Sequence, residues 1–135
     1  MRHTFKIVGK IRGKARPRFN VYTKKVYTTP QDREFESLIR QSYIESDGLY
    51  FNGNIRAEID LYFAIPKSYT KKRRELCAKN IEKPSKKPDI DNVLKSIFDS
   101  CNKIAYHDDT QIVEVEARKH YTSGEEHMII TFIQL

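Results

Sequence analysis

The strictest hydropathy pattern in this chain of 135 residues runs from position 55 to position 65. Alternate side chains of an extended strand point to the same face, so an apolar residue at every second position predicts a strand with one buried face. Because an apolar stripe of this length must pack against other residues along its whole length, we expect this strand to lie at the centre of a sheet. The apolar positions are Ile55, Ala57, Ile59, Leu61, Phe63 and Ile65.

Other stretches alternate less regularly. Phe5 and Ile7 share one face of a predicted opening strand from Thr4 to Val8, which Gly9 ends. Near the C-terminus, the patterns on either side of a Ser123-Gly124 turn predict that the chain closes with two antiparallel strands. They contain Val113, Val115 and Ala117 before the turn, and Ile130 and Phe132 after it. A small hairpin is also predicted, with Val21, Tyr22, Val26 and Tyr27 flanking Lys24 and Lys25.

Three segments have helical patterns. Thr29, Pro30 and Asp32 form a typical helix start, which predicts a helix from Pro30 to Ser46. A second helix is predicted within Thr70–Asn80. A third is predicted from Ile90 to Asn102, where one broad apolar stripe contains Ile90, Val93, Leu94, Ile97, Phe98 and Cys101.

The expected fold is therefore an α/β mixture of the α+β kind. We expect one compact domain over residues 1–135, with a mixed, largely antiparallel sheet packed by helices. The length suffices for a real core, which eight Tyr, seven Phe and the aliphatic runs supply. No repeat, low-complexity tract or Gly/Ser linker divides the chain.

The chain is basic, with a formal net charge of +7 and a pI near 9.4. Long-range attraction then favours a polyanionic partner. A membrane partner is not expected, because no apolar run approaches the roughly 20 residues that a spanning helix needs and the N-terminus lacks a signal-peptide core. We expect a cytoplasmic protein. Cys77 and Cys101 show no metal-binding spacing and are expected to pack as small apolar residues.

Carboxylates gather around the third predicted helix. Asp89 and Asp91 lie at its entry, and Asp108 and Asp109 lie in the loop that follows it. Hard cations such as Mg²⁺ prefer oxygen ligands and often combine one or two carboxylates with substrate phosphate and water. These residues predict a metal site formed by Asp89, Asp91 and one of Asp108 or Asp109. Asn92 adds an oxygen that can hold a ligand in place.

Simpler roles compete with metal binding. Asp89 can merely cap the helix and oppose its dipole. A calcium-binding helix-loop-helix is excluded, because Val93 and Leu94 occupy the positions where that loop needs an oxygen ligand and a glycine. For Asp99, an exposed ion pair with Lys95 or Lys103 is a better interpretation than a ligand role.

Two further side chains near these carboxylates are of types that can take part in catalysis. Lys95 lies one helical turn after Asp91, so its ammonium can stabilise negative charge on a metal-bound phosphate or orient water. His107 can accept a proton near neutral pH, although a lone loop histidine is more often structural or solvent-exposed.

Basic residues alternate before the first predicted helix. Such a flexible arm can follow phosphates, although a solvated surface run remains the alternative. The residues in question are Lys10, Arg12, Lys14, Arg16 and Arg18. Lys71 to Arg74 and the Lys86-Lys87 pair, within an exposed approach from Glu82 to Pro88, add further charge.

Three stretches together resemble the signature of RusA-type crossover junction endodeoxyribonucleases. They are Lys87-Pro88-Asp89-Ile90-Asp91-Asn92-Val93-Leu94-Lys95, Phe98-Asp99, and Tyr106-His107-Asp108-Asp109-Thr110-Gln111-Ile112. The resemblance implies a homodimeric, magnesium-dependent nuclease. It also implies that Asp89, Asp91 and Asp109 bind metal and are catalytic, that Lys95 is the catalytic lysine, and that Asp108 is a supporting residue.

The resulting hypothesis is an endonuclease that resolves four-way (Holliday) DNA junctions by paired nicks during recombination and repair. Mg²⁺ is the expected cofactor, and Mn²⁺ is expected to substitute. Two alternatives remain open: a non-catalytic DNA-binding module whose carboxylates only cap the helix, and a metal-dependent nuclease that acts on other branched DNA or on RNA.

Overall fold

Strand β4 (Ile55–Ala64) lies inside a four-stranded sheet, as its hydropathy pattern predicts. A computed structural model describes residues 1–14, 18–27 and 29–135, with residues 18, 19, 26 and 27 described by their backbone alone. Every second residue of β4 from Ile55 to Phe63 is buried. The buried face of this strand is the base of the hydrophobic core.

The other three strands of the sheet are β1 (Arg2–Val8), β5 (Ile112–Thr122) and β6 (His127–Gln134). Their order is β1-β6-β4-β5. β6 pairs antiparallel with both β1 and β4, whereas β5 pairs parallel with β4. The prediction of a mixed, largely antiparallel sheet is confirmed.

The two closing strands are antiparallel, as predicted, but they are not hydrogen-bonded neighbours. β5 and β6 run in opposite directions, but β4 lies between them. The connection of residues 123–126 passes over the end of β4, where the Glu126 carboxylate accepts the backbone N–H of Ala64. β4 thereby pairs along both edges, and the partly exposed Val113 and Val115 of β5 lie on an outer strand.

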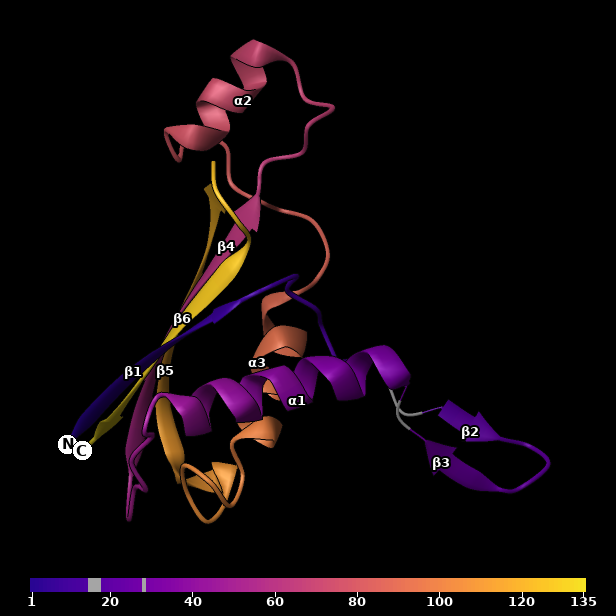
Figure 1. Cartoon of the computed structure of the whole chain (residues 1–135), viewed down its shortest axis with the longest axis vertical. Coiled ribbons are helices and arrows are strands. Elements are labelled where there is room, and N and C mark those ends of the chain that lie inside the picture. The colour runs from indigo at the N-terminus through magenta and orange to yellow at the C-terminus, as the bar shows by residue number, and fades with distance from the viewer. Residues whose placement is uncertain (15–17, 28) are drawn as a thin grey trace.

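The helices are α1 (Pro30–Glu45), α2 (Lys71–Ala78) and α3 (Ile90–Ser100). All three lie inside the predicted ranges, and the Thr29 and Thr70 hydroxyls accept a backbone N–H at the starts of α1 and α2. α1 crosses α3 on one side of the sheet, whereas α2 lies beyond the end of the sheet (Figure 1). A short 3₁₀ turn, η1 (Asp109–Gln111), precedes β5.

An aromatic cluster fills the core between this sheet face and the helices. Phe132 of β6 is fully buried. Its ring lies 5.7 to 6.2 Å from four other aromatic rings, measured between centroids. Those rings belong to Phe5, Tyr43, Phe51 and Tyr106. The cluster joins β1 and β6 of the sheet to α1, to the segment before β4 and to the segment between α3 and η1.

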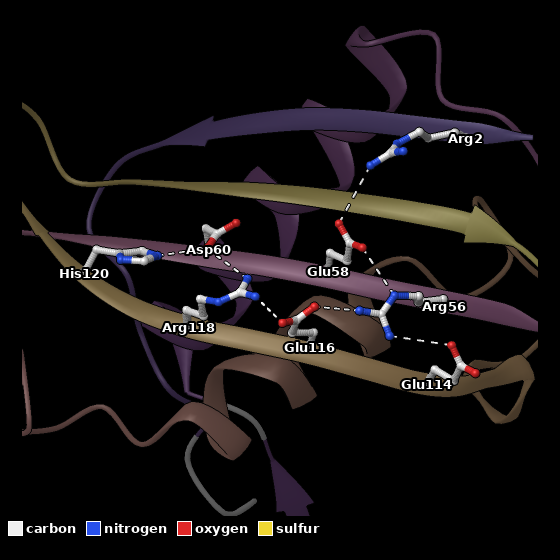
Figure 2. Close-up of polar contacts among 8 residues, drawn as sticks. All are labelled: Arg2, Arg56, Glu58, Asp60, Glu114, Glu116, Arg118 and His120. Atoms are coloured by element: carbon white, nitrogen blue, oxygen red, sulfur yellow. Dashed lines mark hydrogen bonds and ion pairs between the residues drawn. The ribbon is translucent and has the colours of Figure 1, made fainter.

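The opposite face of the sheet carries charged side chains in a ladder of ion pairs (Figure 2). Arg56 is the centre of this ladder, with Glu116 at 2.6 Å and Glu58 at 3.2 Å. Further along, Asp60 lies 2.8 Å from a ring nitrogen of His120. Acids and bases on this face therefore largely neutralise one another.

The predicted hairpin is present, but its turn lies earlier than expected. β2 (Arg18–Asn20) pairs with β3 (Lys25–Tyr27). Val21 and Tyr22 lie in the connecting turn rather than in a strand, because the Asn20 side chain accepts the backbone N–H groups of Tyr22 and Thr23. This local hydrogen bonding is typical of asparagine in turns.

Both cysteines are free and fully buried, which confirms that they pack as small side chains. Across the described ranges, the longest helix, α1, has 16 residues, and no helix is long and apolar enough to cross a membrane.

Candidate active site

Asp89 and Asp91 occupy the first turn of α3. Asp89 is the N-cap residue, yet its side chain accepts no capping hydrogen bond. Both carboxylates are exposed. The capping role considered for Asp89 is therefore not what its side chain does, and the carboxylate remains available at a helix N-terminus.

Asp91, Lys95 and Asp99 follow one another at intervals of four residues and so lie along one side of α3. Lys95 is exposed. It forms no ion pair within the described ranges. This side of the helix thus presents a carboxylate, an ammonium and a second carboxylate in sequence.

Asp99 forms its ion pair with the N-terminal segment and not within its own helix. The Lys14 ammonium lies 2.8 Å from Asp99 and 2.9 Å from Glu36 of α1. The predicted pairing of Asp99 with Lys95 or Lys103 is therefore wrong. Lys14 joins α1 to α3, and its side chain is only 16% exposed.

The environment of Lys14 also affects its protonation. Burial acts to lower the pKa of Lys14, but the hydrogen bonds and charges of Asp99 and Glu36 outweigh burial and raise the pKa above its ordinary value of 10.5. The cation therefore contributes to folding below that value and stops contributing as pH rises through the raised pKa.

Replacement Lys14→Met should lower the free energy of unfolding by about 1–3 kcal/mol near pH 7, because two partly buried carboxylates lose their partner. Urea unfolding at several pH values measures this loss. The difference from the parent protein should stay constant to about pH 9 and shrink above the ordinary lysine pKa of 10.5. A difference unchanged near pH 12 would contradict an ion-pair origin, and Lys14→Arg should retain most of the stability.

Asp108 and Asp109 have different roles. Asp108 caps η1, where its side chain accepts the Thr110 N–H and Gln111 completes a capping box. Asp109 lies one residue further, and its backbone N–H donates to the Asn102 side chain at 2.9 Å. The Asp109 carboxylate is therefore not used to cap this turn.

Asp109 lies in a crowded acidic environment. Burial raises the pKa of Asp109, and the hydrogen bond and charge of Asp108 and the nearby Asp99 raise it further. The pKa of Asp108 is lowered, first by its hydrogen bond with Asp109 and then by the Thr110 amide. A cation at this cluster would relieve the repulsion between the carboxylates.

Gln111 holds the loop that carries Asp109. Its side-chain oxygen accepts the backbone N–H groups of His107 and Asp108, and its amide nitrogen donates to the carbonyls of Phe51 and Gly53. Reasoning from the sequence assigned no role to Gln111. The Asp-x-x-Gln spacing of a capping box is the signal that could have done so.

Replacement Gln111→Glu removes the two donors and adds a negative charge beside Asp108. If Asp109 binds Mg²⁺ in a nuclease site, as the family resemblance implies, Mg²⁺ affinity or cleavage activity should fall by about 10- to 100-fold, the usual cost of losing a group that orients metal ligands. A Mg²⁺ titration of cleavage measures the change. The control is Thr110→Ala on the same turn, and an unaltered titration curve for Gln111→Glu would contradict the positioning role.

An open cleft of about 390 Å³ lies beside Asp89. Its walls include Arg12, Gly13 and Lys14 on one side and Lys87, Pro88, Asp89 and Asn92 on the other. The Lys14 N–H donates to the Asn92 carbonyl at 3.0 Å. A side chain at Gly13 would come within 2.9 Å of the Asn92 Cβ and 3.0 Å of the Pro88 Cβ.

This packing corrects the idea of a wholly flexible arm, because the described part through Lys14 is docked on α3. Arg12 and Lys87 reach the cleft, while Lys10 and Lys86 are exposed outside its lining. Arg16 and the side chain of Arg18 lie outside the described residues. The predicted approach to the site is exposed at Lys83, Ser85, Lys86 and Lys87.

The structure brings Asp99, Asp108 and Asp109 together, but it does not join Asp89, Asp91 and Asp109 into one preformed site. In the ranges described, no group of three or more His, Cys, Asp or Glu side chains has a metal-binding arrangement. His107 is exposed at the edge of the cluster, and one ring nitrogen lies 3.5 Å from the Lys103 ammonium.

Comparison with known proteins bears on this arrangement. A family model described as endodeoxyribonuclease RusA matches residues 9–132, which include the cleft, α3 and η1. The chain is also similar to a Bacillus subtilis (strain 168) protein named uncharacterized protein YqaN. The two are 26% identical over 125 residues, covering 87% of each chain. The extent of the family match shows that this chain belongs to the RusA family of endodeoxyribonucleases.

Proposed function

We propose that this protein is a Mg²⁺-dependent endonuclease that resolves four-way DNA junctions by paired nicks, in recombination and repair. Family membership supports nuclease chemistry. The observation that supports this site most strongly is the N-cap carboxylate of Asp89, which makes no capping hydrogen bond and lines a cleft with Arg12 and Lys87. Negative groups for a cation and positive groups for phosphate therefore lie side by side.

The donor set fits a hard divalent cation. Asp89, Asp91 and Asp109 offer carboxylate oxygens, which Mg²⁺ prefers and Mn²⁺ also accepts. When bound, the cation would activate water and neutralise charge on the phosphate that is cut. Asp89 and Asp91 are exposed at a helix start, so their side chains can reorient toward the cation without moving buried groups.

Other residues have supporting roles in this proposal. Lys95 presents its ammonium to the phosphate, stabilising charge as it develops on the phosphoryl oxygens. Asn92 and Asp108 hold the backbone on either side of the ligands, since the Asn92 carbonyl accepts the Lys14 N–H and Asp108 caps η1. Lys14 then positions α3 instead of contacting DNA, because its ammonium is already paired twice.

Paired nicking requires two active sites, one for each strand. A homodimer supplies both, and its two-fold axis matches the approximate two-fold symmetry of a four-way junction. Arg12, Lys87, Lys10 and Lys86 would then contact backbone phosphates near each site.

The decisive experiment compares a four-way junction, a linear duplex and RNA, each with Mg²⁺, Mn²⁺ or EDTA. We expect paired nicks in the junction with either metal and none with EDTA. Junction binding without nicking in either metal would show a non-catalytic binding module. Preferential cleavage of RNA would show that the protein is a metal-dependent nuclease whose substrate is RNA instead of a DNA junction. Sedimentation of the protein, with and without junction, tests the homodimer.

A further inference from the structure

Residues 67–87, between β4 and α3, form one of two strongly basic segments of this chain. Nine Lys and Arg against two Glu give this segment +7, which equals the formal net charge of +7 for all 135 residues. Residues 1–31 are the other basic segment, with nine Lys and Arg and no Asp or Glu. The electrostatic attraction for a polyanion therefore comes from α2 and the approach to the site as well as from the N-terminal segment.

Most of these cations form no ion pair within the described part of the chain. Of the nine, only Arg73 forms an ion pair with another described residue, Glu82 at 3.0 Å. Arg73 also lies over the Tyr69 ring, 3.6 Å from its centroid. Arg73 thus links α2 to the segments before and after it. The other Lys and Arg side chains of α2 remain exposed to solvent.

The first turn of α2 has an arrangement that is unfavourable for the isolated helix. Residues 71–74 read Lys-Lys-Arg-Arg, and no acidic side chain lies in this turn. Cations at a helix N-terminus oppose the macrodipole, and they also repel one another. An anion bound beside Lys71 and Arg74 would relieve both effects.

A cavity beside this turn provides the place for such an anion. Its volume is about 390 Å³, and its lining includes Lys67, Lys71 and Arg74, Ser123 and Gly124 of the β5–β6 connection, and the apolar Ala64, Ile65 and Ala78. Only Glu75 adds an acid to the lining. The cavity is separate from the cleft at Asp89, with which it shares no residue. In Figure 1, α2 lies beyond the end of the sheet, away from η1.

We propose that this cavity, which we call the α2 phosphate site, binds backbone phosphates of a duplex DNA arm outside the position of cleavage. The inference rests on the proposed function for its ligand. Lys71 and Arg74 each neutralise a phosphate, and Lys67 and the Gly124 turn form the opposite wall. Contact at both sites would fix the duplex relative to the cleft at Asp89.

The test is the salt dependence of junction binding, measured by fluorescence anisotropy in the Asp91→Asn background with EDTA present. Each phosphate contact contributes about 0.9 to the slope of log affinity against log salt. The double variant Lys71→Gln/Arg74→Gln should therefore lower the slope by about 1.8 and weaken binding by the order of 10-fold. Circular dichroism confirms that α2 remains folded.

The matched control is Arg2→Gln/Lys6→Gln, which removes one Arg and one Lys from β1 and should leave the slope near the parent value. The charge-retaining variant Lys71→Arg/Arg74→Lys should also bind like the parent. Equal slopes for the α2 variant and the control would overturn the α2 phosphate site alone. A lower slope for the α2 variant, combined with no nicking by the protein that retains Asp91, would support the α2 phosphate site and overturn the nuclease assignment. If the protein that retains Asp91 and Arg74 does not bind DNA, both proposals are overturned.

Discussion

Replacement Asp91→Asn should abolish junction cleavage while leaving junction binding intact. Asn keeps the size of the side chain but removes the negative charge that a divalent cation requires from its ligand. If the bound cation lowers the activation free energy of cleavage by about 4 kcal/mol, its loss lowers the cleavage rate by about 10³-fold. Single-turnover cleavage of a labelled four-way junction measures the rate, and anisotropy measures the binding.

A matched substitution separates the metal role from general loss of an acid. Asp47→Asn changes an exposed Asp in the turn after α1, where the backbone φ of 56° suits Asn as well as Asp. This control should cleave like the parent. Retained cleavage by Asp91→Asn would remove Asp91 from the ligand set, whereas loss of both cleavage and binding would point to a folding or DNA-contact role.

The largest expected loss of stability follows from Phe132→Ala. Phe132 is fully buried among four aromatic rings, so truncation removes its apolar burial and leaves a cavity. We expect the free energy of unfolding to fall by about 3–5 kcal/mol, as for other buried Phe residues. Urea unfolding followed by far-UV circular dichroism measures the change as a shift of the midpoint with little change in slope.

Phe132→Leu is the control for side-chain volume, because Leu refills part of the space and should cost less than Ala. The truncation also tests a link to the site. Phe51 and Tyr106 contact Phe132, and the Phe51 carbonyl accepts a hydrogen bond from Gln111. Phe132→Ala should therefore loosen the packing of the loop that carries Asp109 at urea concentrations below those that unfold the sheet. A loss below about 1 kcal/mol would contradict central packing.

Local periodicity predicted the elements of this fold, but it could not predict all of their neighbours. The alternation in β4 and the capping pattern at Thr29 act within a few residues, and both elements formed where expected. Strand pairing is different, because β5 and β6 have patterns that fit either a hairpin or separate neighbours. Burial of β4 along both edges decides between these pairings, and that is a property of the whole sheet.

The same distinction holds for the candidate site. The four-residue spacing of Asp91, Lys95 and Asp99 correctly indicates one side of a helix. The partner of Asp99 could not be predicted, because Lys14 lies 85 positions earlier in the chain. The preference for Asp109 over Asp108 came from family resemblance, and the capping role of Asp108 now adds a physical reason to propose the same choice.

The docked segment before the hairpin has a consequence for the entropy of DNA binding. It lies outside any helix or strand from Lys10 to Lys14, yet the Ile11 N–H donates to the Glu126 carboxylate at 2.6 Å and the Lys14 N–H to Asn92. Arg12 therefore extends from a backbone that folding has already ordered. A phosphate bound by Arg12 costs the loss of side-chain freedom but little further ordering of the chain, so more of the contact energy is retained as affinity.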